Sequence, residues 1–80
     1  MTSMKLKLIY PEEKIKEPLL SKVCKNFNVD INIRKANVQE KIGWLELEFI
    51  GSEEEIEKAI QFLVDNNVEV LPIEGQVFIE

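Results

Sequence analysis

Few side chains in this 80-residue sequence have the type and spacing that enzyme chemistry needs. Histidine, the commonest general base and a frequent metal ligand, is absent. The three serines, Ser3, Ser21 and Ser52, lie in segments where the pattern places no base beside them. The single cysteine, Cys24, falls on the apolar stripe of an expected helix, where we expect a buried structural thiol and not a nucleophile. We therefore expect a domain that is not an enzyme.

Two acidic runs remain as candidates for a metal site. The carboxylates of Glu12–Glu13 and Glu53–Glu55 could contact a hard cation. The second run, however, is typical of the first turn of a helix, where the helix dipole alone favours acidic residues. A single cysteine cannot form a thiolate metal site, and the sequence has no glycine-rich phosphate loop. We expect neither a bound metal nor a cofactor.

The side chain of Asn32 could either contact a ligand or satisfy a backbone group. Its side-chain amide carries both donors and an acceptor, which suit the carboxylate and ammonium groups of an amino acid. An asparagine beside an irregularity in a strand can equally satisfy a nearby backbone group. The residue pattern alone leaves both roles open.

Length and composition predict one small globular domain over residues 1–80. The hydrophobic fraction is 45% and the charged fraction 31%, which is too apolar for intrinsic disorder. The net charge is −5 and the lysines alternate with glutamates, so we expect no nucleic-acid partner. No apolar run has the length of a signal peptide or a membrane span, and one cysteine excludes an internal disulfide. We expect a cytoplasmic protein with no direct membrane insertion.

The first half of the chain reads as a strand, a helix and two further strands. A strand over Met4–Tyr10 alternates apolar and polar residues and ends at Pro11. A helix is predicted from about Pro18, with apolar residues spaced by three and four: Leu19, Leu20, Val23, Cys24 and Phe27. The next strands are predicted over Val29–Val38, with a β-bulge near Arg34–Lys35 where the alternation slips, and over Gly43–Ile50, joined by a hairpin at Gln39–Ile42.

The second half predicts another helix and strand. Gly51 is expected to break the third strand, and Ser52 with Glu55 forms a capping-box pattern ahead of a helical stripe. The stripe is made of Ile56, Ala59, Ile60, Leu63 and Val64. Asn66–Asn67 stops the helix, Val68–Ile73 is a strand that Pro72 assigns to a sheet edge, and Gln76–Ile79 is a candidate short extra strand.

This element order, βαββαβ, predicts an α+β fold of the ferredoxin-like type. Right-handed crossovers interleave the two halves into a four-stranded antiparallel sheet with both helices on one face. The other face is left open, and the strand phases predict its occupants: Lys5, Lys7, Ile9, Asn32, Arg34, Trp44, Glu46, Glu48, Ile50, Glu69 and Leu71.

Two interpretations of this open face are possible. Its charges are expected to form a solvated ladder of ion pairs, each contributing under about 1 kcal/mol. Trp44, with Ile9, Ile50 and Leu71, is a candidate contact patch through which a homodimer forms. The alternative is that Trp44 packs only on the stems of neighbouring lysines.

The sequence also resembles a known family. The run FNVDINIRKANV at Phe27–Val38, preceded by EPLLSKVCK and followed by IGWLELEFIGSEEEIEKAIQFLVDNNVEVLPI, is similar to the NIL domain. The Asn-Ile-Leu tripeptide that names the family reads Asn32-Ile33-Arg34 here, so the third position departs from the name. The resemblance covers nearly the whole chain.

The resemblance implies a ferredoxin-like fold similar to that of ACT domains, paired through the sheets. In the ATPase subunits of methionine importers, an ABC transporter class, such a domain binds L-methionine at the dimer interface and inhibits transport, and the motif asparagine corresponds to Asn32. In a second context the domain precedes iron–sulfur cluster motifs in proteins of sulfur assimilation. The Tyr10-Pro11 start and the closing Gln76–Glu80 look more like that second group. The sequence itself contains neither an ATPase domain nor cluster-binding cysteines, so it is either a stand-alone NIL protein or an excised piece.

The leading hypothesis is a dimeric regulatory domain that senses L-methionine or a related sulfur amino acid. The resemblance implies that Asn32 holds the polar end of the ligand, with Ile31, Ile33 and Trp44 as apolar neighbours. The alternative is a protein-interaction module that docks an iron–sulfur protein or a sulfur-assimilation enzyme and binds no metabolite.

Overall fold

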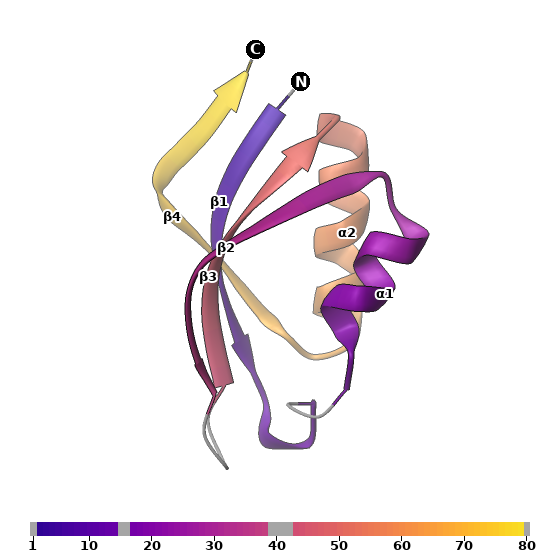
Figure 1. Cartoon of the computed structure of the whole chain (residues 1–80), viewed down its shortest axis with the longest axis vertical. Helices are drawn as coiled ribbons and strands as arrows, with labels where there is room; N and C mark the ends of the chain where they lie inside the picture. The colour runs from indigo at the N-terminus through magenta and orange to yellow at the C-terminus, as the bar shows by residue number, and fades with distance from the viewer. Residues whose placement is uncertain (1, 15–16, 39–42, 80) are drawn as a thin grey trace.

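The computed structural model describes residues 2–14, 17–38 and 43–79 of the chain. These residues form one antiparallel sheet with two helices on a single face (Figure 1). The elements in chain order are β1 (Thr2–Tyr10), η1 (Glu12–Lys14), α1 (Leu19–Asn26), β2 (Val29–Val38), β3 (Gly43–Gly51), α2 (Glu53–Asp65) and β4 (Glu69–Ile79). The hairpin expected at Gln39–Ile42 lies outside the described residues.

The strands lie in the order β2-β3-β1-β4, all antiparallel to their neighbours. The predicted α+β ferredoxin-like fold is therefore confirmed, with β1 between β3 and β4. Pro72 lies on β4, an edge strand, as expected for a residue without a backbone N–H. The predicted β-bulge is also present, since the register of β2 on β3 shifts between Ile33 and Lys35.

The core lies between the sheet and the helices. Its centre is formed by side chains of β1 and β3 that are almost completely buried, and α1 and α2 close over them. Among the residues whose burial the structure describes, the buried hydrophobic ones are Leu6, Leu8, Leu19, Val23, Val29, Leu45, Leu47, Phe49, Ile56, Ala59, Leu63 and Val68. The two helices also contact each other through the rings of Phe27 and Phe62, whose centroids are 5.8 Å apart. This cluster covers one face of the sheet only.

The N-terminus of α2 forms half of the capping box predicted for it. The backbone N–H of Glu55 donates to Oγ of Ser52 over 3.1 Å, as expected for an N-cap serine. The carboxylate of Glu55 does not reach back to the cap residue. It accepts instead from the backbone N–H of Asn28 over 2.9 Å, so it ties α2 to the turn that precedes β2. The competing donor comes from a segment 27 residues away, which a local pattern does not reveal.

Gly51 does not break β3, contrary to the expectation from the sequence. It is the last residue of the strand and pairs with Thr2 of β1 and Val29 of β2. A Cβ at this position would lie 2.9 Å from the carbonyl oxygen of Asn28. Glycine is therefore needed because the backbone of the neighbouring turn approaches closely.

Cys24 is exposed, so the expectation of a buried thiol was wrong. At about 100° per residue, Cys24 lies roughly 140° around α1 from Leu19, whereas Val23 lies within about 40°. Leu19 and Val23 are buried, and Cys24 sits at the margin of the stripe.

The end of the chain forms a single strand and not the two short ones expected. β4 runs from Glu69 to Ile79, and its register on β1 shifts between Met4 and Leu6. The irregularity lets one strand follow β1 along its whole length.

Candidate functional site

The open face of the sheet is organised in cross-strand rows. Each row runs across the strands through directly opposed residues, because neighbouring strands are in antiparallel register. Three of the rows are Asn32–Glu48–Lys5, Lys35–Glu46–Lys7–Leu71 and Asn37–Trp44–Ile9–Glu69.

The lysines and glutamates of this face lie opposite one another across the strands, as the sequence predicted. Lys5 is opposite Glu48, and Lys7 is opposite Glu46. Nζ of Lys35 lies 3.9 Å from Oε2 of Glu46, but the lysine side chain is 73% exposed. Solvent screening limits such a pair to well under about 1 kcal/mol. These charges therefore make the face polar but add little to the stability of the fold.

Trp44 has both kinds of neighbour that the sequence suggested. Nζ of Lys7 lies 4.7 Å from the centre of the Trp44 ring, a cation–π contact worth about 0.5–1 kcal/mol near a surface. Ile9 is directly opposite Trp44 on β1, and Leu71, one row away on β4, is 38% exposed. Trp44, Ile9 and Leu71 together form an apolar strip bordered by charged side chains.

The four residues expected to contact a ligand are divided between the two faces of the sheet. Asn32 and Trp44 share the open face, but Asn32 is opposite Glu48, four positions along β3 from Trp44. At about 3.3 Å per residue their Cα atoms differ by roughly 13 Å along the strand direction. Ile31 and Ile33 are opposite Phe49 and Leu47 and so belong to the helix face. Within one subunit, Asn32 and Trp44 are thus at different ends of the open face.

The surroundings of Asn32 bear on the two roles that the sequence left open. The side chain is exposed and lies two residues before the bulge. Within the described part of the chain, its amide makes no hydrogen bond to a backbone group. The amide is therefore available to a molecule arriving on the open face, and its role in ligand binding stays a prediction.

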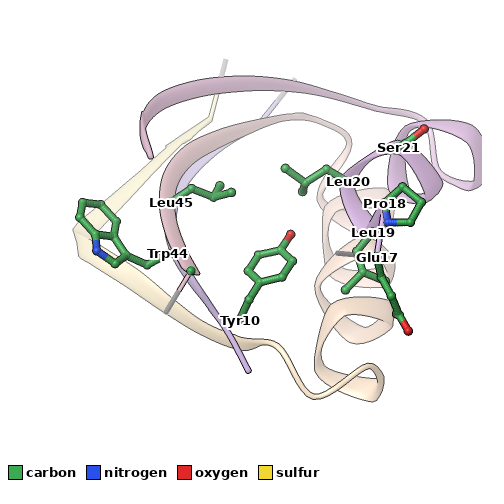
Figure 2. A pocket seen from close by; sticks show the side chains of 9 residues that line it. Tyr10, Glu17, Pro18, Leu19, Leu20, Ser21, Trp44 and Leu45 are labelled. Carbon is green, nitrogen blue, oxygen red and sulfur yellow. The ribbon is translucent and has the colours of Figure 1, made fainter. Parts of the chain in front are cut away.

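A pocket on the helix face was missed by the sequence analysis. It has a volume of about 200 Å³ and lies between the start of α1, the end of β1 and the start of β3. Figure 2 shows the side chains around it. The residues that line it are Tyr10, Glu17, Pro18, Leu19, Leu20, Ser21, Gly43, Trp44 and Leu45. Tyr10 and Leu8 are on the same face of β1, and the alternation predicts that face for both. It does not show that Leu8 is in the core while Tyr10 lines a pocket.

Residues 2–14, 17–38 and 43–79 contain no group of three or more histidine, cysteine or acidic side chains placed to hold a metal ion. Among the same residues, no helix has the length and apolar character to cross a membrane.

Comparison with known protein families shows to which family this chain is related. The sequence model of the NIL domain matches residues 5–71. The chain belongs to the NIL domain family. The match begins in β1 and ends near the start of β4, so it includes both helices, β2 and β3 completely and the other two strands in part.

The NIL domain of this chain is similar to segments of two kinds of larger protein. It is 31% identical over 61 residues to the methionine import ATP-binding protein MetN of Helicobacter pylori strain J99, covering 71% of this chain and 19% of that protein. It is 36% identical over 72 residues to MetN of Photobacterium profundum, covering 82% of this chain and 21% of that protein. It is 45% identical over 51 residues to the L-aspartate semialdehyde sulfurtransferase iron-sulfur subunit of Methanocaldococcus jannaschii, covering 64% of this chain and 39% of that subunit. The chain thus spans about a fifth to two fifths of the length of these relatives.

A solved structure shares this arrangement of the NIL fold. The C-terminal domain of an ABC transporter ATP-binding protein from Enterococcus faecalis superposes with a TM-score of 0.80 and 26% sequence identity. The alignment covers 91% of this chain and 86% of the other. Both contexts expected from the resemblance, importer ATPases and iron–sulfur proteins, are therefore represented among the relatives.

Proposed function

We propose that this NIL domain is a non-catalytic regulatory domain that binds L-methionine or a related sulfur amino acid. The proposed site is on the open face of the sheet, where two copies of the domain meet. The names of the relatives support the ligand class, since most of those reported above are methionine import proteins. The cytoplasmic location expected from the sequence remains part of the proposal.

One observation carries the location of the site. The helices cover one face of the sheet, while the other presents an apolar strip together with the exposed amide of Asn32. Asn32 and Trp44 are too far apart to hold one small ligand within a single subunit. Antiparallel pairing of two open faces would bring Asn32 of one copy toward the Trp44 end of the other. The ligand would then favour the paired arrangement by binding it more tightly than the single subunit.

Calorimetric titration with L-methionine tests the ligand. We expect saturable heat with L-methionine, little with D-methionine, and loss of the heat in Asn32→Ala. Gln61→Ala is the control and should retain the heat, because Gln61 is an exposed amide on α2, away from the open face. Absence of heat from a folded protein shown to be free of co-purified methionine would rule out this ligand.

Sedimentation tests the pairing of the open faces. Leu71 and Val64 are both large, exposed apolar side chains, with 38% and 48% of their surface accessible, but Leu71 is on the open face and Val64 on α2. Leu71→Glu is expected to shift the protein to monomer, whereas Val64→Glu leaves the dimer intact. A wild-type protein that is monomeric at high micromolar concentration would contradict the proposal.

The second candidate is a module that docks an iron–sulfur protein or a sulfur-assimilation enzyme and binds no metabolite. It is favoured by the 45% identity to the sulfurtransferase iron-sulfur subunit, the highest identity among the three relatives described above. In that case the apolar strip is the docking surface. Trp44→Ala would then weaken binding to the iron–sulfur partner, and L-methionine would produce no heat.

A further inference from the structure

The pocket on the helix face has the size and lining of a small-molecule site. Its volume of about 200 Å³ exceeds the roughly 150 Å³ of cavities that take up a benzene ring. Its walls are aliphatic and aromatic side chains from both layers of the domain, chiefly Tyr10, Pro18, Leu19, Leu20 and Leu45. An apolar space of this kind is favourable for a ligand that brings apolar surface out of water.

The hydroxyl of Tyr10 supplies the polar group of the pocket. Figure 2 shows the phenol pointing toward the space between Leu20 and Leu45. Tyr10 is half-buried, and among the described residues its hydroxyl makes no hydrogen bond and is not sealed from solvent, so it is accessible to a molecule in the pocket. Burial raises the pKa of Tyr10 to about 12, so the group keeps its proton at neutral pH and remains a hydrogen-bond donor.

The charges around the pocket disfavour an ionic ligand. Glu17 is the one charged residue that lines it within the described chain. Its carboxylate lies 3.4 Å from Nζ of Lys14, so this charge is already paired at the rim. A cation would have to compete with Lys14, and an anion would approach a carboxylate.

We propose that this pocket binds a small, uncharged and mostly apolar molecule that presents one carbonyl oxygen to the Tyr10 hydroxyl. The ligand would fill the space beneath the first turn of α1 and accept a hydrogen bond at its inner end. The site is separate from the proposed methionine site, because the Trp44 side chain points away from the pocket toward the open face (Figure 2).

Such a ligand would stabilise the less secure of the two helices. α1 has eight residues, and Pro18 at its N-cap makes no side-chain hydrogen bond to the first turn. α2 has thirteen residues and the Ser52 cap. A molecule held between α1 and the sheet would add contacts where α1 begins, so binding would be reported by the amide signals of Leu19 and Leu20.

The test uses two probes of nearly the same shape, acetophenone and α-methylstyrene. Acetophenone has a carbonyl oxygen where α-methylstyrene has a methylene group. In amide NMR titrations of the full chain, both are expected to shift signals of Tyr10, Leu20 and Leu45. Acetophenone is expected to bind about three to ten times more tightly, which corresponds to one neutral hydrogen bond.

Variants separate the hydrogen bond from the apolar contact. Tyr10→Phe keeps the ring and removes the hydroxyl, so it is expected to abolish the preference for acetophenone while α-methylstyrene still binds. Leu20→Trp is expected to fill the pocket and reduce binding of both probes at least tenfold. Val64→Ala is the control, since Val64 is exposed on α2 and does not line the pocket, so both affinities should be unchanged.

Several outcomes would overturn the proposal. Among them are failure of both probes to bind the folded chain, signal changes confined to the open face, and equal affinities of the two probes for the unaltered chain. Persistence of the preference for acetophenone in Tyr10→Phe would also overturn it. If Tyr10→Phe fails to fold, unchanged binding of both probes by Leu20→Trp would overturn it. Asn32→Ala should leave acetophenone binding intact, and Tyr10→Phe should leave any methionine heat intact. Failure of this site and failure of the methionine site are therefore distinguishable.

Discussion

Strand β3 contributes to both faces of the sheet, and its alternate residues meet very different surroundings. Leu45, Leu47 and Phe49 face the helices, and none exposes more than 9% of its surface. Trp44, Glu46 and Glu48 face the other way and are only partly buried. Neighbouring residues of one strand therefore have different physical roles.

The difference between the faces follows from what covers them. On the covered face, each large apolar side chain contributes roughly 1.5–3 kcal/mol by leaving water. On the open face, the observed contacts include the Lys35–Glu46 ion pair and the Lys7–Trp44 cation–π pair, each worth about 1 kcal/mol or less. The covered face holds the fold, and the open face can change its contacts at small cost. Recognition of a partner domain is compatible with the second surface, whereas the first offers a small molecule only the pocket beside Tyr10.

The largest contrast is expected between Leu47→Ala and Glu48→Ala. Leu47 is fully buried under the helices, so the loss of its side chain is expected to lower the free energy of unfolding by about 2–5 kcal/mol. Glu48→Ala, one residue along, should change it by about 0.5 kcal/mol or less. Urea unfolding followed by circular dichroism measures both. Similar losses in the two variants would show that the open face is also part of the core.

Gly51→Ala, at the last residue of β3, is expected to have the next largest effect on the free energy of unfolding. The new methyl group would lie 2.9 Å from the carbonyl oxygen of Asn28 and 3.3 Å from Cγ1 of Val29. Because Gly51 is paired on both sides, neither neighbour can move away freely, and we expect a loss of about 1–3 kcal/mol in urea unfolding. Ser52→Gly is the adjacent control and should cost only a few tenths of a kcal/mol. Equal stability of Gly51→Ala and the unaltered chain would refute the close approach.

Sequence patterns predicted the two faces because alternation along a strand is a local property. The phases of β1 and β3 assign Lys5, Lys7 and Trp44 to the open face, and the structure places them there. The slip of alternation in β2 likewise located the bulge, since one inserted residue reverses all the side chains that follow. These features depend on neighbours in sequence, which the pattern contains.

The features that the sequence did not reveal depend on distant neighbours. The exposure of Cys24 depends on which side of α1 faces the sheet, and the partner of Glu55 is a backbone N–H near the start of β2. The separation of Asn32 from Trp44 depends on the register between β2 and β3. The pocket at Tyr10 depends on the angle at which α1 meets the sheet. No pattern within a single segment encodes such distances.

A smaller effect is expected for the contact between Lys7 and Trp44. A double-mutant cycle with Lys7→Ala and Trp44→Ala should give a coupling free energy of about 0.5–1 kcal/mol, because the ammonium group lies over the ring. A parallel cycle on Lys35 and Glu46 should give less, since the lysine of that pair is largely exposed. A Lys7–Trp44 coupling near zero would mean that Trp44 is held by other contacts. Trp44 would then be more easily released to a partner.

The smallest effect is expected at Glu55, which joins the helix layer to the edge of the sheet. The hydrogen bond from the Asn28 N–H, helped by Lys58, lowers the pKa of Glu55 below its ordinary value of 4.5. A carboxyl group with a lower pKa in the folded state stabilises the fold above the unfolded value, and that contribution is lost as the pH falls below about 4.5. Glu55→Gln should therefore lose less stability than the unaltered chain in urea unfolding between neutral and acidic pH. Glu57→Gln, exposed on the same helix, should follow the unaltered chain. If Glu55→Gln also followed it, the link between α2 and the start of β2 would not depend on this charge, and the helix layer would be held to the sheet by its apolar contacts alone.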